Sequence, residues 1–153
     1  MAMFVSRSLD YALRSLIVLA EKTGGARQSV SLRELSASAS VPRSYLAKVM
    51  RQLVRGGIVN SDAGSTGGYR LAASPDALSL RRVYEVVEGN FQTVTCDASG
   101  RCDLLDDCTQ VAVWNEIEEE ILGVLDRRSL ADFLGQSAEP ALIGPEHIQR
   151  MES

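Results

Sequence analysis

The sequence predicts a mainly α-helical protein with a small β-hairpin: a winged helix-turn-helix domain followed by a long C-terminal dimerisation helix. Three observations support this fold class. Apolar residues recur at helical spacing, a short helix pattern leads through a tight turn into a basic helix, and a glycine-rich hairpin pattern follows at once. We expect a DNA-binding domain over residues 1–90, a cysteine loop over 91–110, a dimerisation region over 111–134 and a flexible tail over 135–153.

The net charge of −4 conceals an uneven distribution along the 153 residues. Residues 27–82 carry nine Arg and Lys against three acidic residues, a net +6, whereas residues 83–153 carry four against fifteen, a net −11. A basic segment of this kind favours a nucleic-acid partner. No apolar run has the roughly 18 residues that a membrane span needs, so we expect a cytoplasmic protein without a membrane partner.

The first helix is expected in "SRSLDYALRSLIVLAEKTGG", with Ser6 or Ser8 as its cap and Gly24 and Gly25 as its end. Its apolar positions follow helical spacing: Leu9, Ala12, Leu13, Leu16, Ile17 and Ala20. The next stretch, "SLRE", is a capping-box pattern in which Ser31 and Glu34 cap each other's amides and open a short helix.

The basic helix is expected in "PRSYLAKVMRQLVRGG", with Pro42 at its first position and Gly56 and Gly57 at its end. Its inner face would contain Leu46, Val49, Met50 and Leu53. Cations on the outer face can neutralise DNA phosphates, and the first turn can reach base edges in the major groove. Tyr45 has a second interpretation, in which it packs beneath the helix. The candidate DNA-binding residues of this helix are Arg43, Ser44, Tyr45, Lys48, Arg51 and Arg55.

A hairpin is expected in "GIVNSDAGSTGGYRLA", with strands at Ile58–Val59 and Tyr69–Leu71. Its tip offers Ser65, Thr66 and Arg70 to the minor groove. A further helix should cover residues 79–88. The long helix in "QVAVWNEIEEEILGVLDRRSL" has apolar residues on one face and acidic residues opposite, which is typical of a dimerisation surface.

All three cysteines, Cys96, Cys102 and Cys108, lie in "CDASGRCDLLDDC", with five residues between neighbours. Thiolates are preferred ligands of iron–sulfur clusters and also bind zinc, although the spacing differs from the tighter pairs of structural zinc sites. A thiol–disulfide switch is a third possibility, since two cysteines could pair and leave one to attack. The residue types leave all three uses open.

The Cys-x5-Cys-x5-Cys loop between a winged helix and a long helix resembles the IscR/NsrR, or Rrf-type, family of bacterial transcription regulators. Supporting matches are "DYALRSL", "SYLAKVMRQLVRGGIV" and "GGYRLA", and the resemblance covers residues 3 to about 134. It implies a homodimer that binds a pseudo-palindromic double-stranded DNA operator. It also implies an iron–sulfur cluster in each subunit, with 4Fe–4S favoured and 2Fe–2S possible.

The resemblance also suggests a fourth ligand. IscR-like members place a histidine where Val111 stands here, and the single histidine, His147, lies in the tail. NsrR-like members use an acidic side chain from the first helix of the opposite subunit, which corresponds to Asp10. Asp10 borders the apolar stripe, where an uncompensated carboxylate is unfavourable, but it could also be an ordinary surface residue. IscR-like members differ at Ala47 and Ala63, so their operator sequence does not transfer.

These observations predict a transcriptional regulator, most simply a repressor, whose cluster senses nitric oxide, redox state or iron–sulfur supply. The alternative is a cluster-free regulator that senses oxidants through its thiols. The sequence contains neither a nucleotide-binding loop nor a neighbouring His–Cys pair, so nothing in it indicates an enzyme.

Overall fold

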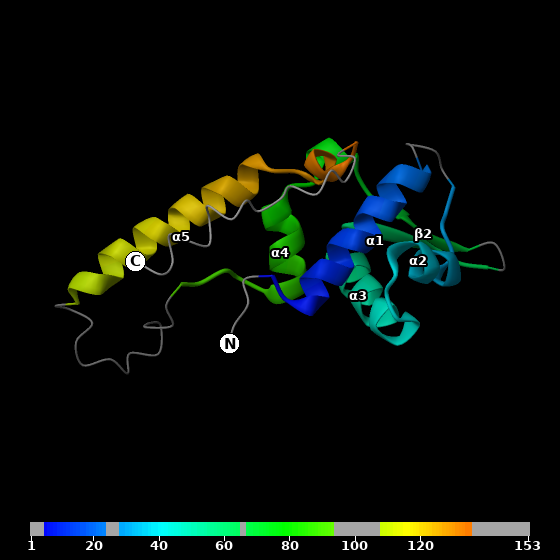
Figure 1. Cartoon of the computed structure of the whole chain (residues 1–153), viewed down its shortest axis with the longest axis horizontal. Helices are drawn as coiled ribbons and strands as arrows, with labels where there is room; N and C mark the ends of the chain where they lie inside the picture. Colours follow the sequence, from blue (N-terminus) through cyan, green and yellow to red (C-terminus); the bar gives the residue numbers. More distant parts are fainter. Residues whose placement is uncertain (1–4, 24–27, 65–66, 94–107, 136–153) are drawn as a thin grey trace, which may run out of the picture.

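The computed structural model describes residues 5–23, 28–64, 67–93 and 108–135. Its elements are α1 (Arg7–Thr23), α2 (Leu32–Ala39), α3 (Arg43–Arg55), β1 (Val59–Asp62), β2 (Gly68–Leu71), η1 (Pro75–Ala77), α4 (Leu80–Glu88), α5 (Thr109–Arg127) and η3 (Leu130–Phe133). Helices α1 to α4 and the hairpin form one body, and α5 extends away from it (Figure 1). The predicted fold class, a winged helix-turn-helix followed by a long helix, is confirmed.

Helix α1 begins where Ser6 caps it: the Leu9 amide donates to Ser6 Oγ at 3.1 Å. Ser6 rather than Ser8 is therefore the cap, and its hydroxyl also donates to the Glu88 carboxylate at the end of α4. Four residues of the predicted apolar stripe are buried, namely Leu9, Ala12, Leu16 and Ala20. Leu13 and Ile17 are only partly buried and pack against the core. The helix is thus fixed to α4 at its N-terminal end and to the core along its length.

The helix-turn-helix forms through a capped start and a left-handed turn. Ser31 Oγ accepts from the Glu34 amide at 3.2 Å, which confirms half of the predicted capping box. The Glu34 carboxylate instead contacts Lys22 Nζ at 2.6 Å. Ser40 adopts a φ of 54° and ends α2, after which Pro42 is the N-cap of α3, one position before the predicted one.

The wing is an antiparallel hairpin in which Val59 pairs with Leu71 and Ser61 with Tyr69. Val30 lies on the free edge of β2 and exchanges backbone hydrogen bonds with Tyr69 at 2.9 and 2.8 Å. A Cβ on Gly68 would lie 2.4 Å from the Val30 carbonyl oxygen, so only glycine permits this approach. The wing is therefore attached to the segment that leads into α2.

The C-terminal part of the described chain returns to the core, which the sequence pattern did not reveal. Leu130 in η3 is completely buried, and its amide donates to the Leu78 carbonyl at 2.9 Å. Helix α5, by contrast, has no buried residue. No described helix is long and apolar enough to cross a membrane.

Candidate nucleic-acid interface and cysteine site

Helix α3 separates its residues into an inner and an outer face. Leu46, Val49, Met50 and Leu53 are buried, as predicted. This burial directs the remaining positions outward, because residues three and four apart share a face of a helix. The candidate DNA-binding side chains of α3 are all exposed: Arg43, Ser44, Tyr45, Lys48, Arg51 and Arg55.

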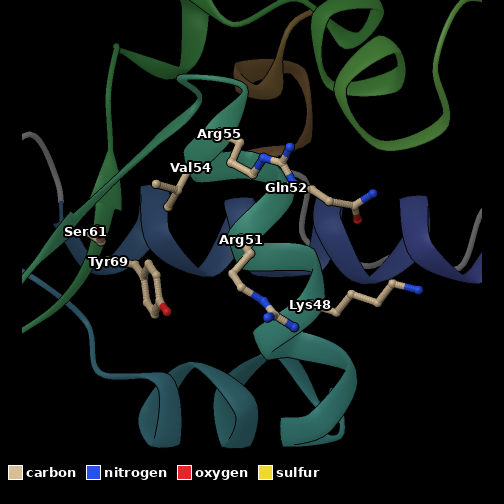
Figure 2. A pocket seen from close by; sticks show the side chains of 7 residues that line it. All are labelled: Lys48, Arg51, Gln52, Val54, Arg55, Ser61 and Tyr69. Atoms are coloured by element: carbon tan, nitrogen blue, oxygen red, sulfur yellow. The ribbon is translucent and has the colours of Figure 1, made fainter.

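A hollow of about 620 Å³ lies between α3 and the hairpin. Figure 2 shows its lining, with Lys48 and Gln52 extending from one side of α3 and Tyr69 facing the helix from the wing. The lining residues are Lys48, Arg51, Gln52, Val54, Arg55, Ser61 and Tyr69. Three cations beside an accessible hollow can hold an anionic polymer such as a DNA backbone.

Four of these lining side chains were not among the predicted DNA-binding residues: Gln52, Val54, Ser61 and Tyr69. Gln52 follows Lys48 by four positions and therefore shares its face of α3. Ser61 and Tyr69 are opposite each other in the hairpin register, so their side chains lie on one face of the sheet. Helical and strand periodicity could have found Gln52, Ser61 and Tyr69.

The predicted wing contacts are only partly described, because Ser65 and Thr66 lie outside the described residues. Arg70 Nε contacts Asp62 Oδ2 at 3.2 Å, and Ser29 also donates to this carboxylate. The hydrogen bond from Ser29 and the nearby Arg70 lower the pKa of Asp62. Since side chains alternate along a strand, Arg70 lies on the opposite face from Tyr69 and outside the hollow.

Tyr45 both packs against a neighbouring helix and stays accessible at the surface, the two alternatives that its sequence position left open. The residue is 52% exposed, and its ring contacts the ring of Tyr11 edge to face with centroids 6.0 Å apart. It therefore packs on α1 and remains accessible at the start of α3. The partner, Tyr11, was not among the helically spaced apolar positions predicted for this helix.

Of the three cysteines, only Cys108 lies among the described residues. It is the N-cap of α5 and is half-buried. Thr93, on the N-terminal side of the cysteine loop, also contacts α5. Its amide donates to Glu118 Oε2 at 2.8 Å, and its Oγ1 donates to the Trp114 carbonyl at 3.1 Å. Cys96 and Cys102 lie outside the described residues, so their geometry stays a prediction.

Asp10 lies on α1 and contacts Arg14 Nε at 3.1 Å. The arginine one turn later therefore compensates the carboxylate at the border of the apolar stripe. Within one chain, the start of α5, which Cys108 caps, lies far from α1 (Figure 1). Among the described residues, no three His, Cys, Asp or Glu side chains gather to hold a metal ion. Asp10 and Cys108 therefore share no site within this subunit.

A winged helix-turn-helix with a cationic, outward-facing second helix defines the class of DNA-binding transcriptional regulators. Residues 5–136 match the Rrf2 family, described as iron-dependent transcriptional regulators, and the chain belongs to this family. It is therefore a regulator and not an enzyme.

Known relatives cover nearly the whole chain. The transcriptional regulator NsrR of Bacillus licheniformis is 30% identical over 146 residues, which is 94% of this chain and 95% of that protein. IscR of Klebsiella pneumoniae is 27% identical over 143 residues, covering 94% and 82%.

Solved structures agree with the fold. T. potens IscR aligns with a TM-score of 0.68 at 25% identity, over 97% of this chain and 98% of that one. CymR, the global cysteine regulator of B. subtilis, aligns with a TM-score of 0.68 at 27% identity, over 86% and 95%.

Proposed function

We propose that this chain forms a homodimer through α5 and binds a pseudo-palindromic operator as a repressor, under the control of an iron–sulfur cluster. The observation that carries DNA binding is the outward cationic face of α3 beside the wing. Arg43, Ser44 and Tyr45 would read base edges in the major groove. Lys48, Arg51 and Arg55 would bind phosphates, and Ser65, Thr66 and Arg70 would follow the minor groove.

The exposed apolar surface of α5 supports dimerisation. Val113 is 56% exposed, Trp114 40% and Val124 50%, and no residue of this 19-residue helix is buried. An extended helix gains little stability in water unless a partner covers its apolar face. A second copy of the same helix would cover this surface symmetrically.

The cluster proposal rests on the donor set and its placement. Cys96, Cys102 and Cys108 would supply three thiolates, and Asp10 of the partner subunit would supply an oxygen. The first amides of a helix have no partner within that helix, and Cys108 makes no side-chain capping bond, so a negatively charged group beside Cys108 would be favoured. Such a cluster supplies redox and nitric oxide reactivity. Three thiolates and one oxygen suit a 4Fe–4S cluster, although a 2Fe–2S cluster can take the same ligands.

Asp10 would couple this site to DNA. An oxygen ligand would be held more weakly than the soft thiolates, so Asp10 would be the ligand most easily lost. Arg14 can take up the released carboxylate, because the two side chains are already in contact. Since Asp10 would come from the opposite subunit, its release would alter the angle between the two α3 helices. The signal would be nitric oxide, redox state or iron–sulfur supply.

A cluster-free thiol switch is the second candidate function. Cys108 is a free, half-buried cysteine, and a disulfide between two of the three cysteines would leave the third as an attacking thiol. CymR, named as a global cysteine regulator, has the same fold as this chain. The family's iron-dependent description favours the cluster.

Anaerobic purification separates the two candidates. The cluster proposal predicts a coloured protein whose visible absorption bleaches under nitric oxide, with bound iron and sulfide in native mass spectrometry. Asp10→Ala should lower cluster content or stability, whereas Asp76→Ala, at an exposed position in η1, should not. Iron-free, colourless protein that binds its operator and responds to oxidants would establish the thiol switch instead. Unchanged cluster content in Asp10→Ala would remove Asp10 from the site.

A further inference from the structure

Arg81 connects α4 to the end of α5. Its Nε donates to Glu85 Oε1 on the same helix at 2.8 Å, and its Nη1 donates to Asp126 Oδ2 on α5 at 2.9 Å. Hydrogen bonds with Glu85 and with Asp126 raise the pKa of Arg81. A planar guanidinium can bridge two carboxylates in fixed directions, which a lysine ammonium does not do.

Arg82, the next residue, connects α4 to the end of α3. Its Nη2 donates to the Gly56 carbonyl oxygen at 2.7 Å, and Gly56 is the C-cap of α3. The two helices also touch directly here, since a Cβ on Gly56 would lie 2.5 Å from Val86 Cγ1. The bond therefore fixes the end of α3 that carries Arg55, one of the cations lining the hollow.

The backbone strengthens the α4–α5 junction. The Leu80 amide donates to the Arg128 carbonyl at 2.8 Å, and the Leu130 amide donates to Leu78 at 2.9 Å. These bonds connect the start of α4 to the chain that leaves α5, and the buried Leu130 anchors this chain in the core. In Figure 1, α4 accordingly lies between α5 and α3. Two consecutive arginines thus hold α4 to the proposed dimerisation helix and to the helix that faces DNA.

We propose that Arg81 and Arg82 are positioning residues that fix the angle between α5 and α3 and so determine which spacing of operator half-sites the dimer accepts. This inference rests on the proposed dimer. One added base pair between half-sites moves the second site by about 3.4 Å and rotates it by about 34°. A rigid connection makes that mismatch costly, and a loosened one tolerates it.

If Arg81 and Arg82 only stabilised the fold, their loss would lower the melting temperature. The ion pairs of Arg81 are largely exposed, and the hydrogen bond from Arg82 to the Gly56 carbonyl is also exposed. Such contacts contribute little to folding stability, so loss of either arginine should leave the melting temperature nearly unchanged. Direct binding of Arg82 to a phosphate is the other alternative. It would reduce the salt dependence of DNA affinity by about one unit of slope without changing the preferred spacing.

The test uses a duplex that the wild-type protein selects from a random-sequence library, together with versions carrying one or two base pairs more or fewer at its centre. Dissociation constants across this series give the spacing discrimination. We expect Arg81→Ala, Asp126→Asn and Arg82→Ala each to reduce this spacing discrimination by at least about threefold. Arg81→Lys should also reduce the spacing discrimination, while the salt dependence of its DNA affinity stays that of wild type. Arg128→Ala is the matched control, since it removes one exposed positive charge near the same junction.

The outcomes separate this inference from the proposed function. A wild-type protein that accepts every spacing equally would refute the dimeric operator complex, and the inference with it. Wild-type discrimination that persists in Arg81→Ala and Arg82→Ala, with dimers confirmed by light scattering, would refute the inference alone. A lower salt slope with unchanged spacing preference in Arg82→Ala would make that residue a phosphate contact.

Discussion

The ring of Tyr45, in the first turn of α3, contacts the ring of Tyr11 on α1 with centroids 6.0 Å apart and planes inclined at 68°. This edge-to-face arrangement is a favourable geometry for two aromatic rings. It fixes the start of the DNA-facing helix to α1 beside Asp10, the proposed cluster ligand. Half of the Tyr45 surface nevertheless remains open to a partner.

Truncation of Tyr45 should therefore affect both stability and DNA binding. Tyr45→Ala should lower the free energy of unfolding by about 0.5–1.5 kcal/mol, the usual contribution of an aromatic pair, and should weaken operator binding. Tyr45→Phe keeps the ring contact and should leave stability within about 0.5 kcal/mol of wild type. Urea unfolding and operator titration measure the two effects. Equal loss of stability in both variants would show that the hydroxyl group, and not the ring contact, is responsible.

Lys48 provides a direct test of how α3 lies on DNA. It is exposed beside Arg51 and Arg55 at the hollow, where its ammonium can bind a phosphate. Lys48→Ala should weaken binding to operator and random DNA alike, and should reduce the slope of log affinity against log salt by about one unit. Fluorescence anisotropy over a salt series measures this slope. A slope identical to that of wild type would place Lys48 away from the backbone.

Periodicity predicted the second helix of the helix-turn-helix well because burial determines which of its residues point inward. The inner face of α3 contains the four residues that its spacing selects, and the hairpin follows Gly56 and Gly57 as expected. Local hydrogen bonds were less predictable. Glu34 binds Lys22, twelve residues earlier, in preference to the Ser31 amide, since a nearby ammonium competes with a local cap.

The junctions between elements were not predictable from local pattern. Leu130 belongs to a four-residue η3 helix with no periodicity of its own, yet it is fully buried. The contacts of Arg81 with Asp126 and of Arg82 with Gly56 join residues 45 and 26 positions apart. Such pairings depend on how helices cross, which a single sequence does not specify.

The close contact of Gly56 with α4 predicts a compensating pair of substitutions. Gly56→Ala should destabilise the protein by about 1–3 kcal/mol, because its Cβ would lie 2.5 Å from Val86 Cγ1. The backbone at Gly56 is helical, with a φ of −78°, so the cost is steric. Val86→Ala should therefore recover part of the loss in the double variant. Thermal unfolding of the single and double variants measures this coupling.

Gly57 is the matched control for the Gly56 and Val86 substitutions. It has a φ of +70° and open space where a Cβ would lie, so Gly57→Ala should cost about 1–2 kcal/mol through backbone strain alone. Val86→Ala should give no recovery at this position. Equal recovery at both glycines would contradict a specific Gly56–Val86 contact.

Asp62 should make wing stability depend on pH. Its pKa is lowered in the folded protein by Ser29 and then by Arg70, so its ionised form stabilises the fold. That contribution is complete above the pKa of the unfolded chain and is lost as the pH falls through the lowered folded value. Asp62→Asn should therefore be less stable than wild type at neutral pH and equally stable in strong acid. A stability difference that is the same at both pH values would exclude the ionised carboxylate as its source.

Leu130 and Val124 should separate folding from dimerisation. Leu130 is fully buried, so Leu130→Ala should lower the free energy of unfolding by about 2–5 kcal/mol. Val124, half exposed on α5, contributes little to the core of one subunit, and Val124→Asp would place a charge on the proposed dimer surface. We expect Val124→Asp to shift the protein toward monomer in light scattering while its far-ultraviolet circular dichroism stays native. If Val124→Asp remained fully dimeric at low micromolar concentration, this face of α5 would not be the interface, and another surface would have to join the subunits.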